Sequence, residues 1–339
     1  MKESGKHQVN FSETAWGWNL VKAVFVGVLL LIALNGKAQQ APPPATGAQD
    51  LEPFRISLNV DLVLLETTVR DRNGRVALGL LEKHFEVYED GVRQSIRLFR
   101  HEDVPVRVGL VVDHSGSMRN KIAEVVAGAR SFVQFSNPED EIFVVNFNEK
   151  VTLGVSADMR FNNRGDELDF AISNSPTTGM TALYDAIANA LERLQVGNKV
   201  KKVLIVISDG GDNASRQTLP GILKMSGQSG ALVYTIGVFD EEDPDRNPGV
   251  LKRLASTTGG EAFFPRELSE VVTICAEIAR EIRSQYTIGY FSANPGPIGS
   301  QRTVRVQAKE PDGRKLIVRT RSGYVVGAHS SAPPQSPIK

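Results

Sequence analysis

Three oxygen-bearing side chains follow a strongly apolar run near the first third of the chain. Asp113, Ser115 and Ser117 are spaced two residues apart in the segment DHSGS, directly after the apolar run Val106–Val112. Side chains at this spacing in a turn can point inward together, and Gly116 permits a tight bend. Carboxylate and hydroxyl oxygens are ligands for hard cations, so the segment favours Mg²⁺ or Mn²⁺, or Ca²⁺, over zinc.

Two further oxygen ligands come from later parts of the chain. Asp209 ends the apolar run VLIVIS, and Thr181 opens the helical pattern ALYDAIANAL. Ligands of open α/β sheets bind outside the carboxyl ends of strands, so we expect these side chains to meet at one sheet edge. The predicted metal ligands are therefore Asp113, Ser115, Ser117, Thr181 and Asp209.

The elements that would position these residues alternate between strands and helices. Runs such as VGLVV and VLIVI are apolar throughout, which is typical of strands buried on both faces. We therefore predict an α/β domain over residues 104–284, with a mostly parallel sheet and helices on both faces. The predicted strands are Val106–Val112, Glu141–Phe147 with a hairpin partner at Val151–Val155, Lys202–Ile207 and Leu232–Val238, and the predicted helices are Arg119–Phe135, Ala182–Leu194 and Leu268–Arg283.

The segments on either side of this domain have β patterns. Residues 54–103 show alternating apolar positions from Ile56 to Leu64, a strand over Val92–Phe99, and the turn dipeptides Asn73-Gly74 and Asp90-Gly91. In residues 285–326, Tyr286, Ile288 and Tyr290 alternate, and a turn at Pro311-Asp312-Gly313 predicts a hairpin of Thr303–Lys309 with Lys315–Arg321. Since one hairpin is marginal alone, we predict that both segments form one discontinuous β-rich domain into which the α/β domain is inserted.

The amino terminus has the features of an export signal. An apolar run over Ala23–Leu34 follows Lys2, Lys6 and Lys22 and precedes small residues at Ala38. We therefore predict a signal peptide over residues 1–38, with an uncleaved anchor as the alternative, and a secreted, periplasmic or envelope location. Residues 39–53 form a Pro/Ala-rich linker, and residues 327–339 a loose Ser/Pro-rich tail.

Composition narrows the possible partners and chemistry. The 339 residues carry 39 basic and 39 acidic side chains, and this zero net charge argues against a nucleic-acid partner. Cys275 is the single cysteine, which excludes an intramolecular disulfide and a cysteine-based zinc cluster. No run after the amino-terminal one is long enough to span a membrane.

The segment DHSGS, the Thr before ALYDA and the strand ending in SDG together resemble the metal-ion-dependent adhesion site of the von Willebrand factor A (VWA) domain. The resemblance implies a Rossmann-like fold over residues 104–284 and metal-mediated ligand binding. Ser115, Ser117 and Thr181 would be ligands, Asp113 and Asp209 would bind directly or through water, and a partner's Glu or Asp would complete the coordination. The flanking segments HFEVYEDGVRQSI and RSGYVV resemble secreted VWFA-related acidobacterial domain proteins.

Each part of the predicted site also has a structural interpretation. Ser117 and Thr181 each precede a helix and could be N-caps, and Asp209 could belong to an ordinary turn. We expect His114 to shape the rim of the site. Asp212 and Asn213 would either bind ligand-associated waters or form a solvated polar turn.

An enzyme is the competing class of function. A Mg²⁺-dependent phosphatase-like hydrolase also has an Asp after an apolar strand, but it needs a second Asp where Ser115 stands, and a Lys near the phosphate. Lys201 and Lys202 precede the strand that Asp209 ends, roughly 20 Å away. We therefore predict a binding protein without catalytic residues, with a structural VWA module whose metal site is vestigial as a further alternative.

Overall fold

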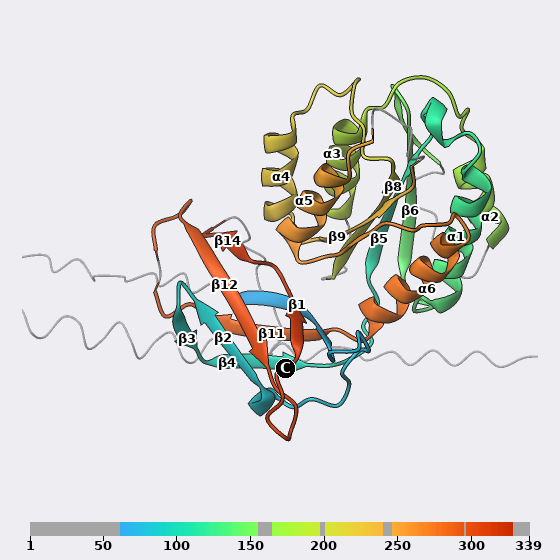
Figure 1. The fold of residues 1–339 in the computed structure, drawn as a ribbon. Coiled ribbons are helices and arrows are strands. Elements are labelled where there is room, and N and C mark those ends of the chain that lie inside the picture. Colours follow the sequence, from blue (N-terminus) through green and yellow to red (C-terminus); the bar gives the residue numbers. More distant parts are fainter. Residues whose placement is uncertain (1–61, 155–164, 197–200, 240–245, 295, 328–339) are drawn as a thin grey trace, which may run out of the picture. The chain divides into compact units, whose positions relative to one another are not determined.

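A six-stranded sheet lies at the centre of the inserted part of the chain (Figure 1). The computed structural model describes residues 62–154, 165–196, 201–239, 246–294 and 296–327. The strand order is β10-β9-β8-β5-β6-β7, and all neighbouring strands are parallel except the β6–β7 pair. These strands are β5 (Arg107–Asp113), β6 (Glu141–Phe147), β7 (Val151–Leu153), β8 (Lys202–Ser208), β9 (Leu232–Gly237) and β10 (Ala262–Phe263).

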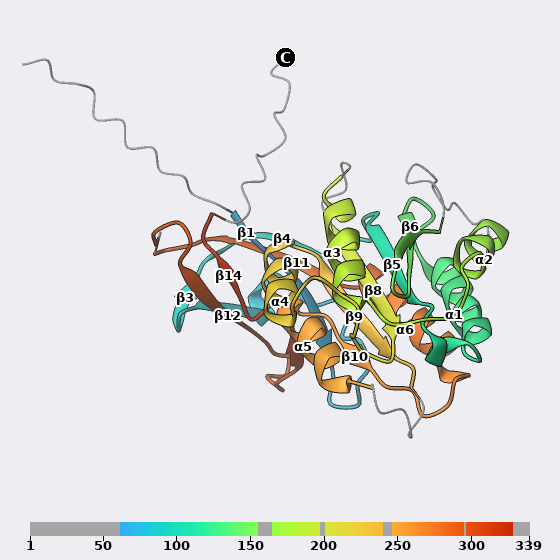
Figure 2. The same ribbon diagram turned by 90° about the horizontal axis from the view of Figure 1, so that it is seen from above.

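Helices cover both faces of this sheet, as Figure 1 and the view from above in Figure 2 show. One face packs against α1 (Ile122–Phe135), α2 (Gly165–Ser173) and α6 (Glu270–Arg283). The other packs against α3 (Leu183–Leu194), α4 (Leu219–Gln228) and α5 (Pro248–Thr258). This arrangement explains why β5 and β8 are apolar throughout, because their side chains enter an apolar core on each face.

Two antiparallel sheets make up the β-rich part of the chain, residues 62–100 and 286–325. Their strand orders are β13-β1-β11-β4 and β14-β12-β2-β3. The first sheet contains β1 (Leu62–Arg70), β4 (Ile96–Arg100), β11 (Tyr286–Phe291) and β13 (Ile317–Arg319). The second contains β2 (Phe85–Glu89), β3 (Val92–Gln94), β12 (Gln301–Ala308) and β14 (Gly323–Val325).

Strands from before and after the insertion pair with each other in both of these sheets. Leu65 of β1 pairs with Ile288 of β11, and Val87 of β2 pairs with Val306 of β12. All four side chains belong to the shared apolar core of the β-rich part. The predicted fold class, a mostly parallel α/β domain inserted in a smaller discontinuous β-rich part, is thus confirmed.

Two local predictions for the β-rich part were wrong in detail. The predicted strand Val92–Phe99 is divided between β3 and β4, which belong to different sheets. The turn near Gly313 closes a bridge between Lys309 and Lys315, but β13 then leaves β12 to pair with β1. In β1, Leu62 is exposed whereas Val63 and Leu65 are buried, so the face of the strand that carries Val63 and Leu65 is turned to the core.

The inserted part is joined to the β-rich part by a buried carboxylate on α6. Glu281 accepts hydrogen bonds from Tyr234 of β9 (2.7 Å) and Thr68 of β1 (3.2 Å), and it pairs with Arg70 and Arg319. The nearby arginines lower the pKa of Glu281 although burial alone would raise it. A charge buried in this way is stabilised only while its partners remain in place, so the cluster fixes the junction.

The predicted signal peptide, linker and tail lie outside the described residues, as does most of the alternating pattern from Ile56. Within the described ranges, no helix combines the length and the apolar character needed to cross a membrane.

Candidate metal site at the carboxyl edge of the parallel sheet

The two predicted aspartate ligands meet because β5 and β8 are neighbouring parallel strands. Val112 pairs with Ile207, so Asp113 at the end of β5 and Asp209 just after β8 reach the same sheet edge. The chain continues from β5 to β6 on one side and later places β8 on the other side. This reversal is the position where open α/β sheets place their ligands.

The carboxylate of Asp113 is fully buried and held by two hydrogen bonds. Its Oδ1 accepts from the backbone N–H of Ser115 at 2.8 Å, and its Oδ2 accepts from the hydroxyl of Ser208 at 2.6 Å. The Ser208 hydroxyl in turn accepts from the N–H of Gly210 at 3.0 Å. The orientation of Asp113 is therefore fixed by the strand that carries Asp209.

The hydroxyls of Ser115 and Ser117 connect the two strand ends. Their oxygens are 3.1 Å apart, and the Ser117 hydroxyl donates to Oδ2 of Asp209 at 2.5 Å. The other carboxylate oxygen of Asp209 accepts from the N–H of Gly211 at 3.0 Å. Four of the five predicted ligands thus lie in one continuous hydrogen-bonded group.

Thr181, the fifth predicted ligand, is buried on a loop that contacts both strand ends. Its N–H donates to Oδ1 of Asn213 at 2.8 Å, and its carbonyl accepts from the N–H of Asn213 at 3.0 Å. On the other side, the N–H of Gly116 donates to the carbonyl of Gly179 at 3.2 Å. The structure therefore places the Thr181 loop between the segment after β5 and the segment after β8.

The electrostatics of this group favour a cation. Burial, and then the nearby charge of Asp209, raise the pKa of Asp113 to about 6. Keeping both carboxylates charged is costly in such a place, and a divalent ion would relieve that cost. Across the described ranges, no three His, Cys, Asp or Glu side chains gather to hold a metal, so an ion here would rely on the hydroxyls as well. Two carboxylates with neutral hydroxyl oxygens suit Mg²⁺, Mn²⁺ or Ca²⁺.

The helix-capping interpretation of the two hydroxyl residues is wrong. The N-cap of α3 is Ala182 rather than Thr181, and the N-cap of α1 is Lys121; neither makes a side-chain capping bond. Ser117 lies in a short 3-10 helix, Gly116–Met118, and its hydroxyl is directed to Asp209. The hydroxyls are thus not explained by the local needs of the helices.

His114 does not form the rim, contrary to the sequence prediction. The imidazole is buried, with 1% of its surface exposed, and burial lowers its pKa. The backbone explains this position, because the N–H of His114 donates to the carbonyl of Phe147 at 2.6 Å and draws the residue against the end of β6.

Asp212 and Asn213 support the start of α3. Asp212 accepts from the hydroxyl of Ser215 at 2.6 Å and from the N–H of Tyr184 at 3.3 Å, while Asn213 binds Thr181 as described above. The free N–H groups at a helix start attract such side chains, even from a distant loop. This supporting role was not predicted, although Asp and Asn so close to a predicted ligand were a usable signal.

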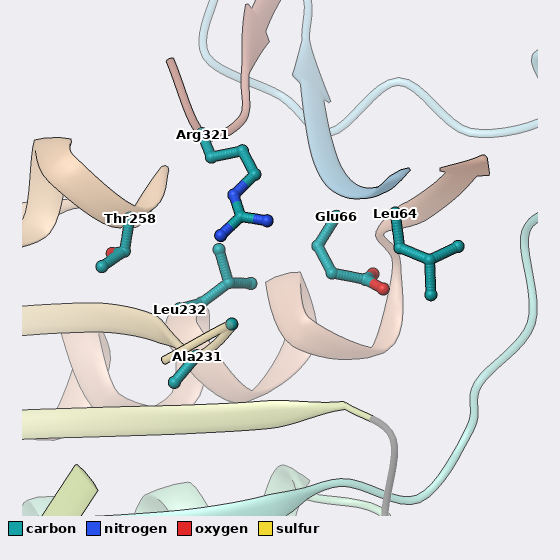
Figure 3. Close-up of a pocket in the computed structure, with 7 residues that line it drawn as sticks. Leu64, Glu66, Ala231, Leu232, Thr258 and Arg321 are labelled. Atoms are coloured by element: carbon teal, nitrogen blue, oxygen red, sulfur yellow. The ribbon is translucent and has the colours of Figure 1, made fainter. Parts of the chain in front are cut away.

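A small pocket lies at the other end of the sheet, where β9 begins. Figure 3 shows Arg321 and Glu66 entering it from one side, with Ala231, Leu232 and Thr258 on the other. Arg321 donates to the carbonyl of Gly227, and Glu66 faces Lys201 at 3.7 Å. None of the predicted ligands lines this pocket, so it is separate from the candidate metal site.

A doubly wound α/β domain with an oxygen-ligand group at its carboxyl edge defines the class of this protein. Residues 108–211 match the von Willebrand factor type A domain family, and this part of the chain is a VWA domain. The matched segment includes all five candidate ligands.

Several solved structures are similar to the chain. A von Willebrand factor type A protein from Catenulispora acidiphila is 15% identical, with 79% of this chain and 74% of that chain covered and a TM-score of 0.45. The vWF domain of the type V pili tip protein Mfa5 from Porphyromonas gingivalis is 15% identical, with coverage of 53% and 95% and a TM-score of 0.43. BatB from Bacteroides thetaiotaomicron is 15% identical, with coverage of 53% and 100% and a TM-score of 0.41. No curated protein matches the sequence at a significant level.

Proposed function

We propose that this protein is a metal-dependent binding protein whose VWA domain captures an acidic group of a protein or polymer partner through a bound divalent cation. One observation carries the proposal: two buried carboxylates, Asp113 and Asp209, are joined at the edge of the parallel sheet through the backbone N–H of Ser115 and the hydroxyls of Ser115 and Ser117. Mg²⁺ is the first choice of ion, with Mn²⁺ and Ca²⁺ as alternatives that the same oxygen ligands accept.

The balance of charge in this group explains why the partner would be acidic. Hydroxyl ligands are neutral, so a bound ion would keep part of its positive charge and would attract a further anionic oxygen. The ligands come from three loops, and we propose that a Glu or Asp side chain of the partner supplies a further oxygen from outside the chain.

The residues around the candidate site are compatible with a protein partner. Met180 precedes the ligand Thr181 and has 54% of its surface exposed, and Arg119, two residues after Ser117, is also exposed. An exposed apolar side chain and an exposed cation near the ligand segments in the sequence would offer contact area and charge to an acidic segment of a partner.

We propose no catalytic function for the site. Lys201 lies at the opposite end of β8 from Asp209, where its ammonium group donates to the carbonyl of Ile282 at 2.6 Å. Ser115 occupies the place of the general acid that a phosphatase-like reaction requires. A phosphatase assay with Mg²⁺ tests this part, and turnover that Asp113→Ala abolishes would favour the hydrolase.

We also propose that the protein is exported, on the basis of the signal predicted over residues 1–38. A secreted, periplasmic or envelope-bound protein would meet extracellular partners and millimolar divalent cations. Cell fractionation tests this proposal, and recovery of the protein in the cytosol would contradict it.

The function is tested by isothermal titration of the wild type, Thr181→Ala and the control Thr67→Ala with Mg²⁺, Mn²⁺ and Ca²⁺. Thr67 is a buried threonine of β1, far from the site in the topology, so its variant controls for general loss of stability. We expect binding by the wild type and Thr67→Ala and its loss in Thr181→Ala. Absence of heat and of any shift in melting temperature in the wild type would favour the structural module with a vestigial site.

Partner capture is tested by pull-down from the native envelope with and without chelator. The proposal expects a carboxylate-bearing partner that is retained only with the divalent ion present. A partner retained equally well in chelator would contradict ion-mediated capture.

A further inference from the structure

A buried histidine lies between two of the candidate ligands without being one of them. His114 separates Asp113 from Ser115 in the chain, yet its imidazole turns toward the loop between α2 and α3. Its Nδ1 lies 3.3 Å from the hydroxyl oxygen of Thr177. This loop also carries Thr181, so the imidazole links the segment of the first three ligands to the loop of the fourth.

The other ring nitrogen of His114 faces the end of β6. Among the described residues, both Nε2 of His114 and Oδ1 of Asn146 are buried without a hydrogen-bond partner. Burial lowers the pKa of the imidazole, whereas Asn146 and the backbone of Ser175 raise it. The amide nitrogen of Asn146 is already used, because it donates to the carbonyl of Ala171 at 2.6 Å. The free oxygen of Asn146 is therefore an acceptor, and it would be satisfied by a proton on Nε2.

A proton on Nε2 would settle the roles of both ring nitrogens. With the proton on Nε2, Nδ1 has a free lone pair and accepts from the hydroxyl of Thr177. The side chains of Asn146, His114 and Thr177 would then form a polar bridge, and it would satisfy the two buried atoms whose unpaired state is costly. The bridge extends from a rigid central strand to the loop of Thr181.

Backbone contacts hold the same loop at other points. Gly179 accepts from Gly116, and the N–H of Met180 donates to the carboxylate of Glu149 at 3.2 Å. Asn148 and Glu149 follow directly after β6. The carbonyl of Asn148 accepts a hydrogen bond from the N–H of Ala182 at 2.8 Å. These contacts set the path of the loop, while the imidazole joins it by a side chain to the ligand segment itself.

We infer that His114 is a positioning residue of the candidate ion site, which fastens the loop of Thr181 to the segment of Asp113 and so preorganises the ligands. The inference rests on the proposed function of this site. His114 does not touch the ion in this arrangement; it acts through Thr181. Groups that orient metal ligands in this way change metal affinity by about 10- to 100-fold when they are removed.

The test uses the hydroxyl of Thr177, because its removal leaves the histidine and the ligands in place. Thr177→Val keeps the side-chain shape and removes the hydroxyl, whereas Thr177→Ser keeps the hydroxyl and is the matched control. We expect Thr177→Val to bind Mg²⁺ about 10-fold more weakly in isothermal titration, at the low end of such effects. Thr177→Ser should bind like the wild type, and all three proteins should melt at similar temperatures in chelator, since Thr177 is only partly buried.

A second measurement reads the bridge directly. Nitrogen-15 NMR of the imidazole should show the proton on Nε2 in the wild type and a changed Nδ1 signal in Thr177→Val. A proton on Nδ1 in the wild type would overturn the inference. Equal Mg²⁺ affinity of Thr177→Val and the wild type would overturn it while leaving the proposed function intact, whereas a wild type that binds no Mg²⁺ would overturn both.

Discussion

Replacing Asp113 with Asn should have opposite effects on stability with and without a divalent ion. In chelator, Asp113 is a buried carboxylate next to the charge of Asp209, and its pKa is raised from 3.8 to about 6. This rise lowers the unfolding free energy at pH 7 by roughly 3 kcal/mol, because a shift of one pKa unit corresponds to about 1.4 kcal/mol. Asp113→Asn removes the charge, so the variant should be more stable than the wild type in chelator.

The gain will be smaller than the full electrostatic cost. The carboxylate accepts charge-assisted hydrogen bonds from Ser115 and Ser208, and a neutral amide replaces them with weaker ones. We therefore expect a gain of about 1–2 kcal/mol, or a rise in melting temperature of roughly 1–3 °C for a chain of this size.

The pH dependence of the stability difference between Asp113→Asn and the wild type tests the predicted direction of the effect a second time. A carboxyl group whose pKa is raised on folding destabilises the protein above that pKa, and the effect disappears as the pH falls toward the pKa of the unfolded chain. The advantage of Asp113→Asn in chelator should thus be full above about pH 6, fall to roughly half at pH 5, and be small at pH 4.

Saturating Mg²⁺ should reverse the order of stability. A ligand at 100 times its dissociation constant stabilises the folded state by about 2.7 kcal/mol, and Asp113→Asn should lose most of this gain. Differential scanning fluorimetry at pH 7 with chelator and with Mg²⁺ measures both effects. The reasoning is refuted if Asp113→Asn is less stable than the wild type in chelator, or if both proteins respond equally to Mg²⁺.

Asp140→Asn is the matched control for this experiment. Asp140 precedes β6, at the amino end of the sheet, and burial raises its pKa to about 6 as well. Its carboxylate accepts from the N–H groups of Val106 and Asn137. The variant should therefore change stability in chelator without any loss of the response to Mg²⁺.

Three further substitutions test the turn after β8, the junction with the β-rich part and an exposed arginine near the candidate site. Gly210→Ala should lower both the melting temperature and the affinity for Mg²⁺, since Gly210 has a φ of +82° and a Cβ there would lie 2.5 Å from the carbonyl oxygen of Asn247. Scanning fluorimetry measures the melting temperature and titration measures the affinity. Unchanged values would contradict the inference that this turn requires glycine. Glu281→Gln should lower the unfolding free energy by about 3 kcal/mol, because Arg70 and Arg319 lose a buried charge partner and keep only the more exposed Glu261, but it should leave Mg²⁺ affinity unchanged. Urea denaturation measures the loss, and a stability equal to that of the wild type would show that the junction is not held by this charge. Arg119→Gln should keep Mg²⁺ binding but weaken the capture of an acidic partner, and the loss should be larger at low salt than at high salt. A pull-down over a range of ionic strength measures this loss. Salt-independent capture would argue against a role for Arg119.

The sequence was most informative where apolar runs ended in polar residues. The runs of β5 and β8 predicted buried parallel strands, and the aspartate after each run had to lie at the carboxyl edge. Strand geometry alone thus predicted that the two aspartates lie at one sheet edge, whereas Thr181 lies on a loop. Helical periodicity is informative in the same way on α6, where the apolar positions, Cys275 among them, are buried against the sheet.

Features that depend on distant partners were not predictable in this way. A charged residue on the helix α6 predicts exposure, but Glu281 is buried because Arg70 and Arg319 arrive from both ends of the chain. His114 was assigned to the rim because an alternating turn was assumed, whereas the end of β6 covers it. The helix α5 went unpredicted although Asn247 caps its first turn and Pro248 begins it, a recognisable signal for a helix start.

The way the chain enters and leaves the inserted part has a mechanical consequence. The strand before the insertion, β4, and the strand after it, β11, are direct neighbours, with Arg100 opposite Thr287. A pull on the carboxyl edge of the parallel sheet would therefore be divided between two covalent connections that leave from one place on the β-rich part. Such a double tether resists twisting better than a single linker would, and it shears paired strands together instead of peeling one strand from its sheet.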